Sequence, residues 1–159
     1  MASVVQAVGH SPAWRKTLLV ITYDEHGGYY DHVPPPPALA PDAVPPVVAP
    51  GQSPYDGFQR YGFRVPAVVV SPYAFPNGVT HTLYDHTSIL ALVERKWNLP
   101  AMTFRDANAN DLSGFLDRQA VARRSPTFPE LPPLAAPGVS DCPADLAARI
   151  PPAGSVTAA

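Results

Sequence analysis

Two acidic residues, Asp24 and Glu25, are the side chains of this sequence best suited to chemistry. They directly follow an apolar run, Thr17 to Tyr23, that has the composition of a strand. Adjacent carboxylates repel each other, and a divalent cation relieves that repulsion while it orients a phosphoryl oxygen. Because ligands of open parallel sheets bind beyond the carboxyl ends of the strands, the pair predicts a cation or phosphate site. The alternative is that Asp24 caps a turn and Glu25 faces solvent.

Histidines and glycines extend this acidic motif on its carboxyl side. His26 and His32 are candidate ligands or acid–base groups, although a single histidine is more often a structural hydrogen-bonding residue. Gly27 and Gly28 would let the backbone pass close to a ligand. Tyr29 follows directly and is near enough to the acids to line a substrate pocket.

A second acid–histidine motif, Asp85-His86, precedes a predicted helix. Helix N-termini attract anions, so a phosphate or an acidic neighbour near His86 is one reading of this motif. The other is that Asp85 caps the helix and bonds the histidine. In the same way, Asp31 could pair with His32 and fix its imidazole.

The apolar patterns predict an α/β arrangement. Consecutive apolar residues at 17–23 and 64–71 favour two strands that are covered on both faces, as in a parallel sheet. Since such strands need neighbours on both sides, we expect part of a larger sheet to be absent from this chain. Helical segments are predicted at 2–8, 89–98 and 108–116.

Prolines divide the rest of the chain. The proline-rich residues 34–57 predict a long loop, which is either disordered or functional. We expect a partial domain at 1–118 and a Pro/Ala-rich C-terminal tail at 119–159, with one turn of helix at 144–150.

Composition excludes several classes of protein. The chain has 159 residues, which suits one domain, and its net charge of −2 gives no electrostatic case for nucleic acid or an anionic membrane. No apolar run approaches the length of a membrane span, and Met1 to His10 lacks the features of a signal peptide. Cys142 is the single cysteine, and no nucleophile elbow, P-loop or zinc-protease motif is present.

Three stretches together carry a resemblance to a known family. They are SPAWRKTLLVITYDEHGGYYDHVPPP, GFRVPAVVVSPYA and VTHTLYDHTSILALVERKWNLP, and the likeness covers roughly Ser11 to Asp117. In this order and spacing they resemble the bacterial phosphoesterase family, which contains phospholipases C and related acid phosphatases of the alkaline phosphatase superfamily. The resemblance implies an α/β fold: the C-terminal part of an alkaline-phosphatase-like sandwich with a mostly parallel sheet, incomplete in this chain.

The resemblance also implies roles for the residues above. Asp24 and Glu25 match the acidic pair that would bind one divalent metal ion, and carboxylates suit calcium, magnesium, manganese or iron. The other positions fall into three groups: His26, His32 and His86 as catalytic residues near the phosphate or its leaving group; Asp31 and Asp85 as supporting residues; and Gly27, Gly28 and Tyr29 as the substrate pocket.

The resemblance is incomplete in one respect. Members of the family carry a Glu-Asn metal-binding motif and a Ser or Thr nucleophile on early strands, and Met1 to His10 matches neither. We therefore expect a metal-assisted hydrolase of phosphate esters, phospholipids among them, whose nucleophile-bearing part is missing. The localisation cannot be read from this chain, although the resemblance suggests a secreted or periplasmic protein.

Two alternatives come from different classes of function. One is an inactive fragment that packs with a missing N-terminal half or self-associates through open sheet edges. The other is an interaction module whose proline-rich stretches bind aromatic grooves.

Overall fold

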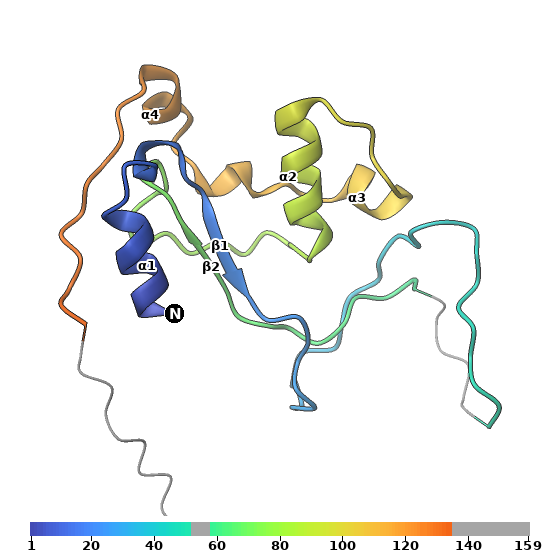
Figure 1. The fold of residues 1–159 in the computed structure, drawn as a ribbon. Coiled ribbons are helices and arrows are strands. Elements are labelled where there is room, and N and C mark those ends of the chain that lie inside the picture. Colours follow the sequence, from blue (N-terminus) through green and yellow to red (C-terminus); the bar gives the residue numbers. More distant parts are fainter. Residues whose placement is uncertain (52–57, 135–159) are drawn as a thin grey trace, which may run out of the picture.

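The computed structural model describes residues 1–51 and 58–134 as a mixture of helices and strands (Figure 1). Its elements in chain order are α1 (Ala2–Gly9), the 3₁₀ turn η1 (Trp14–Lys16), β1 (Leu19–Thr22), β2 (Ala67–Val70), α2 (Thr87–Trp97), α3 (Phe104–Asn108), the 3₁₀ turn η2 (Leu112–Phe115) and α4 (Arg118–Arg123). Among the described residues, no helix is long and apolar enough to cross a membrane.

The two strands form a small sheet in which β1 and β2 run antiparallel. Leu19 lies opposite Val70 and Thr22 lies opposite Ala67. Both strands fall inside the predicted segments, but the parallel direction expected for them is wrong for this pair. An apolar run predicts that a strand is buried but not whether it pairs parallel or antiparallel. The long connection between these two strands permits either direction of pairing.

The sheet is also less covered than the sequence predicts. Every residue of β1 is half-buried, whereas Ala67 and Val68 of β2 are exposed, Val68 by 45%. The buried apolar side chains of the described residues are few, namely Trp14, Pro72, Ala91 and Leu112. The described residues therefore enclose a small core and leave apolar strand surface accessible.

Helix α2 confirms the helix predicted at 89–98 and shows how its ends form. The Asp85 carboxylate accepts hydrogen bonds from the Thr87 hydroxyl at 2.6 Å and the Ser88 N–H at 3.2 Å, while the Asp85 N–H donates to the Ser88 hydroxyl at 3.0 Å. This reciprocal arrangement satisfies free donors at the start of the helix. The helix ends at Asn98, whose left-handed φ of 51° terminates it.

The short helix α3 holds the proline-rich segment, whose described part is irregular as predicted. Its Phe104 N–H donates to the Pro41 oxygen at 2.8 Å. The Arg105 guanidinium donates to the Leu39 oxygen at 2.8 Å and to the Phe58 oxygen. A loop without regular structure is thus tied to a helix by its main-chain oxygens. The helix predicted at 108–116 is instead the end of α3 followed by η2.

The chain from Arg118 onward contains one helix in its described part. It begins with α4, and it then returns to the N-terminal segments beside α1 (Figure 1). The Thr127 N–H donates to the Pro72 oxygen at 2.8 Å, and the Trp14 indole donates to the Thr127 oxygen at 3.0 Å. The helical turn predicted at 144–150 and Cys142 lie outside the described residues, and the boundary between 118 and 119 stays a prediction.

Candidate functional site

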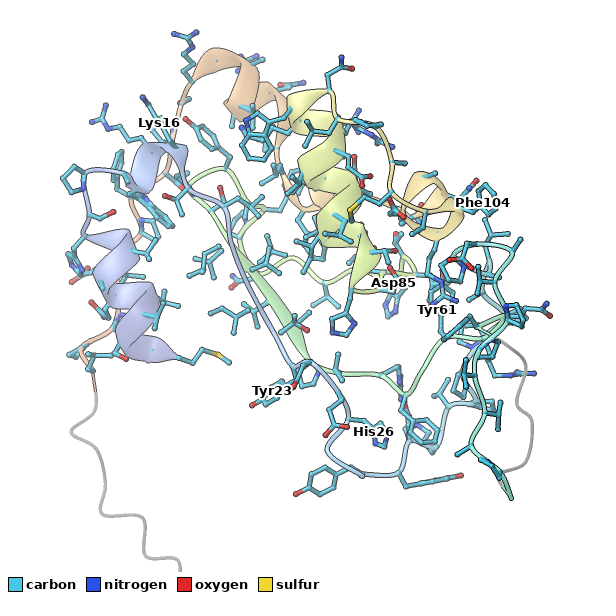
Figure 2. All side chains as sticks on the ribbon, turned by 45° about the vertical axis from the view of Figure 1, so that its right-hand side comes forward. Lys16, Tyr23, His26, Tyr61, Asp85 and Phe104 are labelled. Atoms are coloured by element: carbon cyan, nitrogen blue, oxygen red, sulfur yellow. The ribbon has the colours of Figure 1, made fainter. Side chains whose placement is uncertain are left out.

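A cavity of about 410 Å³ opens between the end of β1, the segment that leads into β2, and the start of α2. Asp24, Glu25 and His26 line it from the loop after β1, and Asp85 and His86 line it from the start of α2. Figure 2 shows Tyr23 and His26 on the first of these segments and Asp85 on the second. The two acid–histidine motifs of the sequence therefore meet at one site.

A hydrogen bond joins these two motifs directly. The Nε2 atom of His86 lies 2.8 Å from the main-chain oxygen of Tyr23. A carbonyl oxygen only accepts, so Nε2 carries the proton. The bond holds the start of α2 against the strand end that precedes Asp24.

The carboxylates of Asp24 and Glu25 remain available for a ligand. Both side chains are exposed and both line the cavity. Within the described residues, neither carboxylate takes part in a hydrogen bond or an ion pair, so the turn cap considered for Asp24 does not form there. Two uncommitted carboxylates suit a hard cation, whose other ligands can be water or substrate oxygens.

The described residues contain no group of three or more histidine, cysteine, aspartate or glutamate side chains placed to hold a metal ion. The fit to a cation therefore rests on the chemistry of Asp24 and Glu25 alone, as two oxygen donors on one cavity wall.

His26 is the histidine of the first motif that faces the cavity. Its Nδ1 lies 3.0 Å from the Tyr29 oxygen, and its ring meets the Phe63 ring edge-on at a centroid distance of 4.8 Å. These contacts fix the ring orientation and engage one ring nitrogen. Nε2 remains for contacts inside the cavity.

Gly27 and Gly28 form the turn that follows His26, with φ angles of 65° and 77°. Such left-handed backbone favours glycine. Neither glycine lines the cavity, and Tyr29 is 80% exposed. Tyr29 instead borders a second hollow of about 390 Å³, together with His26, Tyr30, Asp31, Arg64, Val65 and Pro66.

Asp31 pairs with an arginine that the sequence analysis did not single out. Its two carboxylate oxygens accept from Nε and Nη2 of Arg64, each at 2.8 Å, and one also accepts the Arg64 N–H at 3.1 Å. The Arg64 hydrogen bonds, with one from the Val33 N–H, hold the pKa of Asp31 well below its ordinary value of 3.8. No local pattern could reveal a pair 33 residues apart.

His32 lies apart from this site. Its Nδ1 is 3.8 Å from an Asp31 oxygen and its side chain is 86% exposed. It lines neither hollow. Of the histidines proposed from the sequence, the structure brings His26 and His86 to the cavity and leaves His32 outside it.

Comparison with known proteins identifies the family of the chain. The profile of the Phosphoesterase family matches residues 1–100. Non-specific phospholipase C3 of Arabidopsis thaliana is 39% identical over 140 residues, which cover 81% of this chain and 26% of that protein. Non-specific phospholipase C1 of Arabidopsis thaliana is 42% identical over 114 residues, which cover 65% of this chain and 21% of that protein.

A bacterial relative shows a similar match. Phospholipase C B of Mycobacterium tuberculosis is 38% identical over 109 residues, which cover 63% of this chain and 21% of that protein. The chain thus spans about a quarter of the length of the curated relatives it matches. By the profile and by these relatives, the chain belongs to the Phosphoesterase family.

Proposed function

We propose that this chain supplies part of a site that hydrolyses phosphate esters, of the phospholipase C or acid phosphatase type, with the assistance of one divalent metal ion. The observation that carries the proposal is the cavity in which Asp24, Glu25, His26 and His86 meet, in a member of the Phosphoesterase family. The names of the relatives, which are phospholipases C, support a phosphate ester as the substrate, and a phospholipid in particular.

Each residue of the proposed site has a role that suits its contacts. Asp24 and Glu25 would hold the cation, which is calcium, magnesium, manganese or iron by the chemistry of its ligands. Bound there, the metal supplies positive charge that polarises a phosphoryl oxygen. His26 and His86 would exchange protons with the ester or its leaving group. His32, being outside the cavity, is left out of this site.

The hydroxyl nucleophile of the proposed reaction would come from another part of a family domain. The chain spans about a quarter of its relatives' length, which leaves room for such a part in the proteins it resembles. The accessible apolar surface of β2 supports the same idea, since Val68 is 45% exposed. In this proposal β1 and β2 belong to the larger sheet of an alkaline-phosphatase-like sandwich, and a mixed sheet accommodates one antiparallel pair.

Metal binding and hydrolysis test the proposal. Calorimetry should detect binding of a divalent ion by the chain, and both Asp24→Asn and Glu25→Gln should weaken it by about tenfold or more. Glu130→Gln is the matched control, since Glu130 is exposed and lies outside the cavity. Hydrolysis of p-nitrophenyl phosphate and of phosphatidylcholine vesicles is then measured with metal and with a chelator. Hydrolysis that survives the chelator and the Asp24→Asn change would contradict the proposal.

The second candidate is a catalytically inactive piece that packs with the rest of a family domain or self-associates. The two-stranded sheet favours it, because within the described residues each strand is paired on one edge only and open strand edges pair readily. It predicts oligomers in analytical ultracentrifugation and no turnover. A monomeric chain that hydrolyses either substrate would exclude this candidate.

A further inference from the structure

Arg64 stands out among the side chains of the cavity. Within the described residues, it carries the one permanent positive charge on the cavity wall, where the other ionisable groups are acids, histidines and tyrosines. It also borders the second hollow beside Tyr29. Arg64 therefore lies where the two hollows adjoin, on the wall of the proposed phosphoesterase site.

The Arg64 guanidinium is held in one orientation. Nε and Nη2 each donate to Asp31 at 2.8 Å in a two-point pair, which restrains the plane of the guanidinium. The Arg64 main-chain N–H adds a third bond to the same carboxylate. The Asp31 side chain is 9% exposed, so this anchor is nearly buried.

The remaining N–H groups of the guanidinium are available for a ligand. An arginine presents five donors, and Asp31 engages only those on one edge. The Arg64 side chain is still 63% exposed. A planar fork of this kind matches the geometry of two phosphoryl oxygens.

We propose that Arg64 binds a phosphoryl oxygen of the substrate and that Asp31 is the residue that positions its guanidinium. This inference rests on the proposed function and names a residue for phosphate recognition within it. Charge supports the assignment, because Asp24 and Glu25 repel a phosphate until a cation neutralises them, whereas Arg64 attracts it at all times. A phosphate between the acidic pair and Arg64 would meet positive charge on two sides.

Binding of inorganic phosphate to the full chain, with magnesium or calcium present, tests the inference. Calorimetry should give a dissociation constant that rises at least tenfold in Arg64→Gln, since a charged hydrogen-bond donor is lost. Arg64→Lys keeps the positive charge but loses the two-point hydrogen-bonding geometry of the guanidinium. Its phosphate affinity should fall between those of the wild type and Arg64→Gln. Asp31→Asn should weaken phosphate binding several-fold, and Asp31→Glu should restore part of it.

Arg95→Gln provides the matched control. Arg95 forms an ion pair with Asp111 at 2.5 Å, and the exposed fractions of the two side chains, 68% and 4%, are close to those of the Arg64 pair. Arg95 does not line the cavity. Phosphate affinity should therefore be unchanged in Arg95→Gln.

A second measurement uses the unaltered protein and so does not depend on the folding of a variant. An arginine-selective dicarbonyl reagent, followed by peptide mapping, should modify Arg64 and Arg95, and phosphate should slow the reaction at Arg64 alone. Equal protection of both arginines, unchanged affinity in Arg64→Gln, or no phosphate binding by the wild-type chain would each overturn the inference. Phosphate binding that depends on Arg64 but is unaffected by a chelator and by Asp24→Asn would instead contradict the proposed function, which places a metal ion on Asp24 and Glu25, and would support Arg64.

Discussion

The Nε2 atom of His86 donates a hydrogen bond to the main-chain oxygen of Tyr23 at 2.8 Å, across 63 residues of sequence. Tyr23 immediately precedes Asp24, and His86 adjoins the aspartate that caps α2. One hydrogen bond thus places the second motif beside the first. Because Nε2 is engaged, Nδ1 is the ring atom left to meet a ligand in the cavity.

Loss of this bond should loosen the site. His86→Ala should lower the free energy of unfolding by about 1 kcal/mol, the usual net value of one hydrogen bond. Urea titration followed by circular dichroism measures the change. His81→Ala is the control, because His81 is exposed and does not line the cavity. An equal loss of unfolding free energy in both variants would show that the Tyr23–His86 hydrogen bond does not stabilise the fold.

The tie between α3 and the proline-rich loop should control how mobile the loop is. Arg105→Ala removes the hydrogen bonds to the Leu39 and Phe58 oxygens. It also removes the stacking of the guanidinium over the Tyr61 ring, which lines the cavity. We expect amide hydrogen exchange around Leu39 to rise about tenfold or more, since each such bond contributes roughly 1.5 kcal/mol or more.

The control for the loop experiment is Arg123→Ala. Arg123 lies on α4 and makes only a long 3.5 Å contact with Gln119 within the described residues. Exchange near Leu39 should not change in this variant. Similar exchange in the Arg105 and Arg123 variants would mean that the loop is held by other contacts.

Two acids away from the cavity make stability depend on pH. Glu94 of α2 and Asp106 of α3 are both buried, and a protonated Glu94 can donate a hydrogen bond to the Asp106 carboxylate. Burial, and then this hydrogen bond, raises the pKa of Glu94 above its ordinary value of 4.5. Burial acts to raise the pKa of Asp106 as well, but hydrogen bonds from the Met102 N–H and other donors outweigh it, so that pKa is lowered.

Glu94→Gln should therefore stabilise the protein at high pH. The folded state favours protonated Glu94, so its contribution is fully present below pH 4.5 and is lost as the pH rises through the raised pKa. A glutamine donates to Asp106 at every pH. The urea midpoint of Glu94→Gln should exceed that of the wild type near pH 8 and approach it near pH 4.5. Glu130→Gln should show no such trend, and parallel pH profiles for Glu94→Gln and the wild type would refute the shared-proton pair.

Two glycines allow the effect of backbone strain to be measured where side-chain crowding is absent. A Cβ at Gly28 or at Gly62 would meet no atom within 4 Å, but only Gly28 has a positive φ, at 77°. Gly28→Ala should cost about 1 kcal/mol of unfolding free energy because alanine is disfavoured in this conformation. Gly62→Ala should be close to neutral or slightly stabilising. Equal effects in urea titrations would show that the turn adapts to alanine.

The local features of this protein follow from its sequence. The 3.6-residue apolar period and the capping side chains around Asp85 predicted α2, and the two apolar runs contained β1 and β2. The acidic pair at the strand end and the three matching stretches indicated the Phosphoesterase family, which the profile confirms. These features depend on residues within a few positions of each other, so spacing alone reveals them.

Which distant segments meet depends on the packing of the whole chain. Three features join residues far apart in the chain. They are the antiparallel pairing of β1 with β2, the pairing of Asp31 with Arg64 instead of His32, and the hydrogen bond from His86 to Tyr23. Each depends on how long loops close and on which side chains gain a partner when the segments pack. A local pattern contains no information on that choice, and for this reason the sequence could propose the acids while only the fold placed Arg64 beside them.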